Sequence, residues 1–314
     1  MARSVRPLVR RLTFYKWEGI GSEPLTDWPA AAKALRSLPD DVDRPIPYGD
    51  NTVDVTVDAN GDKDHPTRLT VMRLRSYEER PYVRAPGGPM RPITMRPEER
   101  ILDATHVAVW SDGYAACDQG GYAPTPTSLA LFLQLRIHRA VVFKDLFDRQ
   151  LVQRLHRLQG ITGFAFRVSH ADAVQRELDA ATLGPIRGLF QHLQGGTEQV
   201  IFEGNVHVSG RGRGAHQRIL ESVSPGEVIA LVGQAERFYD TFKVRGRSAG
   251  GRVEEIDLVR ERLQIEQRLP RAPEGGHLPD PNATFTALIA ARSQLDREQR
   301  LVQAVISDVL ATPP

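Results

Sequence analysis

The chain has 314 residues, 40% of them hydrophobic and 25% charged, which excludes a disordered tail and permits one large domain or two smaller ones. Its single cysteine, Cys117, excludes an internal disulfide and a thiolate zinc site and favours a reducing cytoplasm. No apolar run approaches the roughly 18 residues of a membrane span, and 41 basic residues nearly balance 39 acidic ones, so we expect neither membrane insertion nor export and look to the local distribution of charge.

The N-terminal part predicts a strand, a short helix and a hairpin. Branched and aromatic residues favour a strand over 8–17. Asp27 is a candidate N-cap, so we expect a helix from Asp27 to Leu38. Apolar residues then alternate over 52–58 and 69–74, as in the two strands of a hairpin.

The loop of that hairpin is rich in aspartate and superficially resembles a calcium loop. Its twelfth position is Leu69, where a bidentate glutamate is needed. The pair Asn60-Gly61 between alternating runs favours a hairpin turn instead. The next segment, Arg80 to Pro97, has five prolines, so we expect an exposed arm without regular structure.

The middle of the chain predicts a second hairpin and two helices. A buried strand over 105–110 and a returning strand over 114–117 flank a turn at 111–113. Thr127 or Ser128 is a candidate cap for an apolar helix over 129–135. A strand over 139–143 and an amphipathic helix over 145–158 follow.

The rest of the chain alternates between strands and helices. Strands are expected over 161–169, 198–208, 242–247 and 253–263, and helices over 171–193, 216–223, 225–238 and 283–310. The segment 270–281 has the composition of a linker. Leu288, Leu295 and Val302 are seven residues apart in the last helix, which suits packing on its own chain or on a second subunit equally well.

These patterns predict an α+β fold with mixed or antiparallel sheets, packed helices and a long C-terminal helix, in two subdomains. Along the chain we expect three parts. They are a β-rich part over 1–97 that includes the Pro/Arg-rich arm, a central α+β part over 98–270 that carries a basic hairpin, and the linker with the C-terminal helix over 271–314.

Catalytic motifs are weak in this sequence. Gly246-Arg247-Ser248-Ala249-Gly250 fits the pattern of a hydrolase nucleophile elbow, but that elbow requires a strand that feeds a helix, and here a second strand is expected. None of the five lysines lies in a Walker loop. Because the histidines are scattered, we expect no metal site. Because the motifs for hydrolysis and nucleotide binding are not met, we also expect no cofactor, no catalytic residue and no small-molecule substrate.

A group of basic residues stands out instead. The candidate nucleic-acid-binding residues lie in a glycine-rich loop and around a later turn: Arg211, Arg213, Arg218, Lys243, Arg245, Arg247 and Arg252. Three of them, at 243, 245 and 247, are two residues apart, so on a strand all three project from one face and suit a row of phosphates. A solvated strand face with no ligand is the alternative.

Two segments resemble the RexA family of phage exclusion proteins. The first is Thr105 to Leu133, where a buried strand, the Asp112-Gly113 turn and a second strand precede Pro124-Thr125-Pro126-Thr127-Ser128-Leu129 and an apolar helix. The second is the basic hairpin Phe242 to Val253, with its small-residue turn, followed by a charged strand and a final helix. The order of elements is similar from about residue 100 to 300.

The resemblance implies a dimeric α+β protein that binds double-stranded DNA with little sequence preference and helps to exclude superinfecting phage. A separate membrane effector protein is typical of the founding system. Two other functions stay open. One is a metal-dependent nuclease effector of an anti-phage system, and the other is a protein-binding adaptor that binds no nucleic acid.

Overall fold

The computed structural model describes residues 7–39, 44–48, 51–75, 82–84, 90–93, 96, 101–120, 123–168, 202–207, 239–248, 252–257, 262–272 and 278–306. The chain forms two compact units. Unit 1 is Met1–Phe143 with Gln264–Glu298, and unit 2 is Lys144–Leu263 with Gln299–Pro314. Both contain antiparallel sheets and helices, so the expected α+β class is confirmed.

The two units differ from the three expected parts in where the chain divides. Strand β7 (Leu102–Val109) pairs with β4 (Thr67–Leu74), so the sheet continues past residue 97. The C-terminal helix also belongs to unit 1, as does β14 (Gln264–Leu269). The ends of the expected linker pair with each other through the Arg271↔Pro279 bridge, so this segment connects two elements of one unit.

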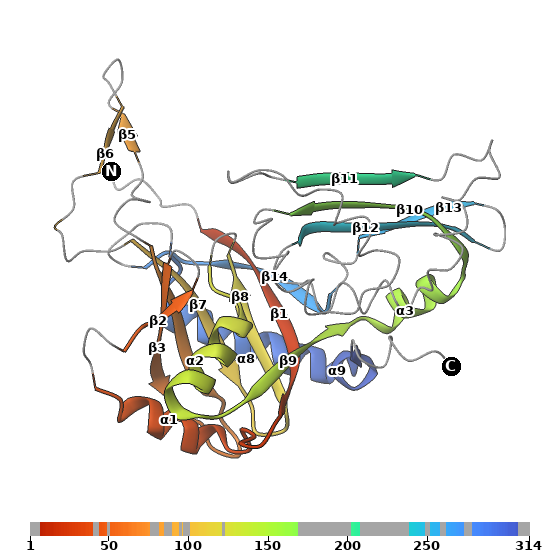
Figure 1. The fold of residues 1–314 in the computed structure, drawn as a ribbon. Helices are drawn as coiled ribbons and strands as arrows, with labels where there is room; N and C mark the ends of the chain where they lie inside the picture. Colours follow the sequence, from red (N-terminus) through yellow and green to blue (C-terminus); the bar gives the residue numbers. More distant parts are fainter. Residues whose placement is uncertain are drawn as a thin grey trace, which may run out of the picture. The chain divides into compact units, whose positions relative to one another are not determined.

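Unit 1 is built on one antiparallel sheet (Figure 1). Its strands are hydrogen-bonded in the order β1 (Leu8–Gly19), β8 (Tyr114–Gln119), β7, β4, β3 (Asn51–Ala59) and β2 (Ile46–Tyr48), and β14 pairs with β1 on the other side. Both predicted hairpins, β3–β4 and β7–β8, are present. In the β3–β4 loop the Asp62 carboxylate accepts from the amides of Asp64 and His65, which closes the turn.

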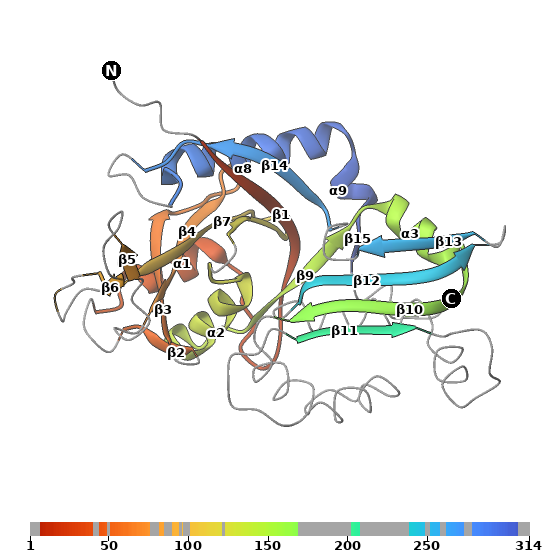
Figure 2. The ribbon, with the colours of Figure 1, turned by 90° about the horizontal axis from the view of Figure 1, so that it is seen from above.

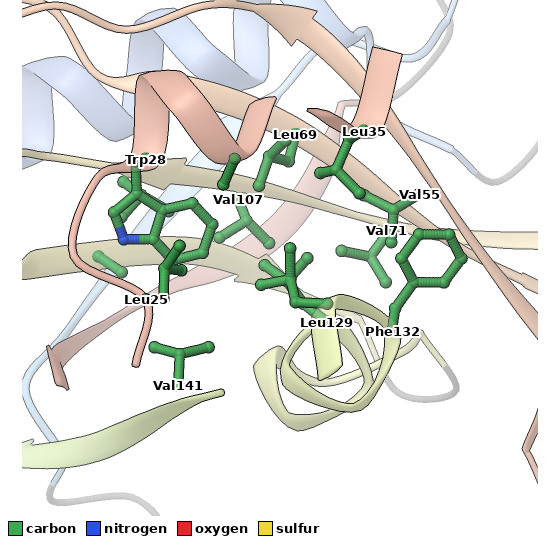
Figure 3. Packing of buried hydrophobic residues seen from close by; sticks show 14 of the residues in the cluster. Leu25, Trp28, Leu35, Val55, Leu69, Val71, Val107, Leu129, Phe132 and Val141 are labelled. Carbon is green, nitrogen blue, oxygen red and sulfur yellow. The ribbon is translucent and has the colours of Figure 1, made fainter. Parts of the chain in front are cut away.

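Two helices cover one face of this sheet. Helix α1 (Trp28–Arg36) begins after its expected N-cap, since the Asp27 carboxylate accepts from the Ala30 amide at 3.2 Å. Helix α2 (Pro126–Ile137) packs beside it. Figure 3 shows how Trp28, Leu129 and Phe132 meet the apolar side chains of the strands, and all three are buried. Removing this apolar surface from water is the main favourable term for the unit.

Helix α8 (Pro281–Arg297) covers the opposite face. His106 alternates with Val107 of the first core along β7, so its side chain lies on the other face. There the imidazole is 5.4 Å from the Phe285 ring, centroid to centroid, in an edge-on arrangement. Its Nδ1 is 3.1 Å from the buried Asp118 carboxylate. Helix α8 therefore packs on its own chain.

The C-terminal helix is shorter than the predicted 283–310. It ends at Arg297, because Gln299 adopts a left-handed conformation with φ 56°. The chain continues as α9 (Arg300–Gln303) and β15 (Val305–Ile306), and β15 pairs with Phe147 and Leu146 of β9 (Val141–Phe147).

Two helix starts differ from the predictions. Helix α2 begins at Pro126, so Thr125 occupies the cap position without a side-chain bond, and neither Thr127 nor Ser128 is the cap. Helix α3 (Arg149–His156) begins four residues after the expected Asp145, because β9 extends to Phe147 and Asp148 caps the helix through the Gln150 amide.

The proline-rich segment 80–97 contains regular structure, contrary to the prediction. Strands β5 (Tyr82–Arg84) and β6 (Met90–Pro92) pair antiparallel. Pro92 lies opposite Tyr82 at the end of a two-stranded ribbon, where a residue without an N–H is tolerated.

Unit 2 contains a four-stranded antiparallel sheet (Figure 2). The order is β11 (Phe202–His207), β10 (Leu158–Val168), β12 (Tyr239–Ser248) and β13 (Val253–Asp257). The register of β10 against β12 shifts at Gly160 and Gly163, where glycine accommodates the irregular backbone. The helices expected over 171–193, 216–223 and 225–238 lie outside the described residues. In the described part of the chain, no helix has the length and apolar character needed to cross a bilayer.

Candidate nucleic-acid interface

The predicted basic row lies on β12 of unit 2. Side chains alternate across a strand, so Lys243, Arg245 and Arg247 share one face of the sheet. Val244, between them, is completely buried on the other face, as is Ile256, its register partner on β13. The Lys243 and Arg245 side chains are 36% and 41% exposed. The sheet therefore has an apolar side and a basic side.

Helix α3 is tied to the apolar side. Arg154 Nε donates to Glu254 Oε1 at 2.7 Å, and Glu254 is two residues from the buried Ile256 on β13. The helix buries Leu151 and Leu155. The face that carries Glu254 and Ile256 is thus occupied by protein, and the basic row belongs to the other face.

The strand on one side of the basic row contributes small residues. Gly163 of β10 lies opposite Arg245, and Ala165 lies opposite Lys243. Cross-strand partners project from the same face of a sheet. No long side chain therefore stands directly beside these two basic residues on the β10 strand.

The strand on the other side brings two carboxylates to this face. Asp257 of β13 lies opposite Lys243 in the register, and Glu255 lies opposite Arg245. Its Oε1 accepts from Lys243 Nζ at 2.8 Å, and its Oε2 accepts from Arg245 Nε at 2.5 Å. These hydrogen bonds, first from Lys243 and then from Arg245, hold the pKa of Glu255 below its ordinary value. One carboxylate thus engages two of the three cations in the row.

Sequence reasoning missed Glu255, although a signal was present. The small residues Ser248-Ala249-Gly250-Gly251 mark the turn, and a hairpin centred on residue 250 places residue 245 opposite residue 255. The predicted residues alone suggested a strongly positive ribbon. From residue 242 to 257 the sequence has four basic and three acidic residues, a net charge of +1.

Of the other five candidate residues, the structure describes two. Arg247 is exposed at the end of β12, opposite Val253, which is 56% exposed. Arg252 is exposed just before β13. Arg211, Arg213 and Arg218 lie outside the described residues. The structure therefore brings four of the seven candidates together on one hairpin.

The Gly-x-Ser-x-Gly pattern falls on this same hairpin. Ser248 is the last residue of β12, and the next element along the chain is β13. A nucleophile elbow needs a helix at that point. The pattern therefore marks a hairpin turn in this chain.

The chain was compared with known proteins, and no family model, curated protein or solved structure matches it. The resemblance to the RexA family accordingly depends on the quoted residues alone.

Proposed function

We propose that this protein binds double-stranded DNA through the phosphate backbone, without reading the base sequence, and that the basic face of unit 2 makes the contact. One observation carries the proposal. Lys243, Arg245 and Arg247 project from a single face of β12, and among the described residues it is the opposite face of that sheet that helix α3 occupies. Contacts to phosphate position a protein on nucleic acid but do not specify sequence.

The resemblance to the RexA family adds the biological setting to this proposal. The protein would act in phage exclusion, as a cytoplasmic homodimer, by occupying DNA rather than by catalysis. A separate membrane effector would be its partner, as in the founding system. Arg211, Arg213, Arg218 and Arg252 would extend the contact beyond β12.

The proposal is tested by a gel shift on unrelated duplexes with the Arg245→Glu, Arg247→Glu double variant. Reversing two charges should weaken binding by at least tenfold and to the same degree on every duplex, because phosphate contacts are independent of sequence. The control is Arg11→Glu with Arg268→Glu, which reverses two exposed arginines on β1 and β14 of unit 1. The control variant should bind like the wild type.

The salt dependence gives a second readout. About six phosphate contacts predict a slope near −5 when log K is plotted against log salt concentration. Failure of the wild type to retain duplex at low salt would reject the proposal and favour a protein-binding adaptor. Cleavage of supercoiled plasmid with magnesium or manganese would instead identify a nuclease.

A further inference from the structure

Glu255 occupies the place in unit 2 where a phosphate would be expected. A carboxylate and a phosphate both present oxygens that accept from ammonium and guanidinium groups at similar distances. Glu255 uses both of its oxygens, one for Lys243 Nζ and one for Arg245 Nε. Two cations of the proposed phosphate contact are thus already bridged by one internal anion.

The fold of the hairpin does not require this bridge. Backbone pairing from Lys243↔Asp257 to Arg247↔Val253 fixes the register, and the buried Val244 and Ile256 anchor the two strands. The Glu255 side chain is 33% exposed, and its two partners are exposed to a similar degree. Ion pairs this exposed contribute little to stability, so the bridge can open at small cost.

We propose that Glu255 is an internal competitor for phosphate, which holds Lys243 and Arg245 in the free protein and is displaced when a nucleic-acid backbone binds. This inference depends on the proposed function, because it assigns a regulatory residue to the same site. Glu255 keeps affinity below the level that the basic row alone would give. Sequence-independent binding to any polyanion is thereby restrained.

Neutralising the carboxylate should release the two cations. In Glu255→Gln the side chain keeps its size and can still accept a hydrogen bond but carries no charge. Exposed ion pairs of this kind are weak, so the variant should bind duplex DNA roughly three- to tenfold more tightly at low salt. This gain in affinity should shrink as the salt concentration rises, because salt screens both the ion pairs of Glu255 and the contacts of Lys243 and Arg245 with phosphate.

Glu266→Gln is the matched control. Glu266 is exposed on β14 of unit 1, and its replacement changes the net charge of the protein by the same amount. If only net charge mattered, both variants would gain equally. We expect a change below twofold for Glu266→Gln, because it is the Glu255 carboxylate of unit 2, and not Glu266 of unit 1, that accepts from Lys243 and Arg245.

A double-mutant cycle separates competition from a structural effect. Lys243→Gln should weaken binding only slightly in the wild type, where Glu255 holds the lysine, and more strongly in the Glu255→Gln background. A purely structural role for Glu255 gives no such dependence. The measurement is the dissociation constant of one 30-bp duplex for all four proteins at two salt concentrations.

Three outcomes decide whether Glu255 competes with phosphate. Tighter binding by Glu255→Gln together with the expected coupling to Lys243 supports the competitor. Unchanged or weaker binding by Glu255→Gln, while Arg245→Glu with Arg247→Glu still loses affinity, overturns the competitor and leaves DNA binding standing. Failure of both the wild type and Glu255→Gln to retain duplex overturns both proposals.

Discussion

Arg292 of α8 is held by partners on the turn between β7 and β8. Its Nη1 donates to Asp112 Oδ1 at 3.0 Å, and its Nη2 donates to Asp112 Oδ2. The guanidinium carbon lies 4.7 Å from the centre of the Trp110 ring and 5.1 Å from that of Tyr114. Only 11% of the Arg292 side chain is exposed. This residue therefore fastens α8 to the turn that joins the central strands β7 and β8 of the unit 1 sheet.

Asp112 makes this contact dependent on pH. Burial alone would raise the pKa of Asp112, but the hydrogen bonds and charge of Arg292 outweigh it, so the pKa lies below its ordinary value. A carboxyl with a depressed pKa in the folded state stabilises above its unfolded pKa of about 3.9, and the stabilisation is lost as the pH falls through the folded value. The Asp112 side chain is itself 51% exposed, so Asp112→Asn should lower the free energy of unfolding by about 0.5–1 kcal/mol at pH 7, and the difference from the wild type should shrink as the pH falls below about 3.9 and through the folded pKa.

Tryptophan fluorescence during urea unfolding measures this effect, because all three tryptophans lie in unit 1. Glu23→Gln is the control. Its partner Arg139 and Glu23 itself are 47% and 64% exposed, so its loss should change stability by no more than a few tenths of a kcal/mol. A deficit in Asp112→Asn that did not shrink at all as the pH fell below about 3.9 would contradict the assignment.

At the scale of single residues, the sequence predicted the basic side chains of the candidate site but not the carboxylate that holds two of them. The spacing of Lys243, Arg245 and Arg247 predicts a shared face, because alternation along one strand is local. The engagement of Lys243 by Glu255 depends on the register between two strands. A register is fixed by turn geometry and by burial, and neither is written in the spacing of charges.

At the scale of elements, alternation predicted the strands well and periodicity predicted the helix ends poorly. The hairpins β3–β4 and β7–β8 follow from period-two patterns beside clear turn residues. Leu146 and Phe147 fit both a helical stripe and a buried strand, so the start of α3 was misplaced. Val302 continues the stripe of α8 past Gln299, where the backbone breaks the helix.

The start of α8 provides a test at this scale. The Asp280 carboxylate accepts from the Ala283 amide at 2.7 Å, and Pro281 occupies the first helical position. Asp280→Ala should cost about 1 kcal/mol of unit 1 stability, whereas Asp280→Asn should cost little, because asparagine caps as well as aspartate. Thr125→Ala, at the cap position of α2, should change stability much less, since Thr125 makes no cap bond there. Equal losses in Asp280→Ala and Thr125→Ala would reject this account, and urea midpoints by tryptophan fluorescence give the comparison.

At the scale of the molecule, unit 2 interrupts unit 1 in the sequence. The chain leaves unit 1 along β9 and returns to it at β14. The two ends of the interruption meet within unit 2. Phe147 and Arg262 form an isolated antiparallel β-bridge there, and the Leu263 amide donates to the Leu146 carbonyl at 2.7 Å. Insertions are tolerated where the two ends lie close together. Unit 1 therefore has the layout of a host domain, completed by a late segment that returns with β14 and α8.

This layout predicts that unit 1 folds without the insertion. The test variant replaces residues 148–261 by a short Asn-Gly turn and ends at Glu298. Of the strands of unit 1, it keeps every one that pairs with β1, β4 or β7. It should show a cooperative urea transition by tryptophan fluorescence and, because β12 is gone, it should not retain duplex DNA.

Ending the same variant at Pro279 removes α8 with its buried Phe285, Leu288, Ala291 and Leu295. Burying each of the three larger side chains contributes about 1.5–3 kcal/mol, comparable in sum to the stability of a whole domain, so that chain should not unfold cooperatively. Loss of cooperative unfolding in the longer variant, or duplex retention equal to that of the full chain, would contradict this division of the molecule.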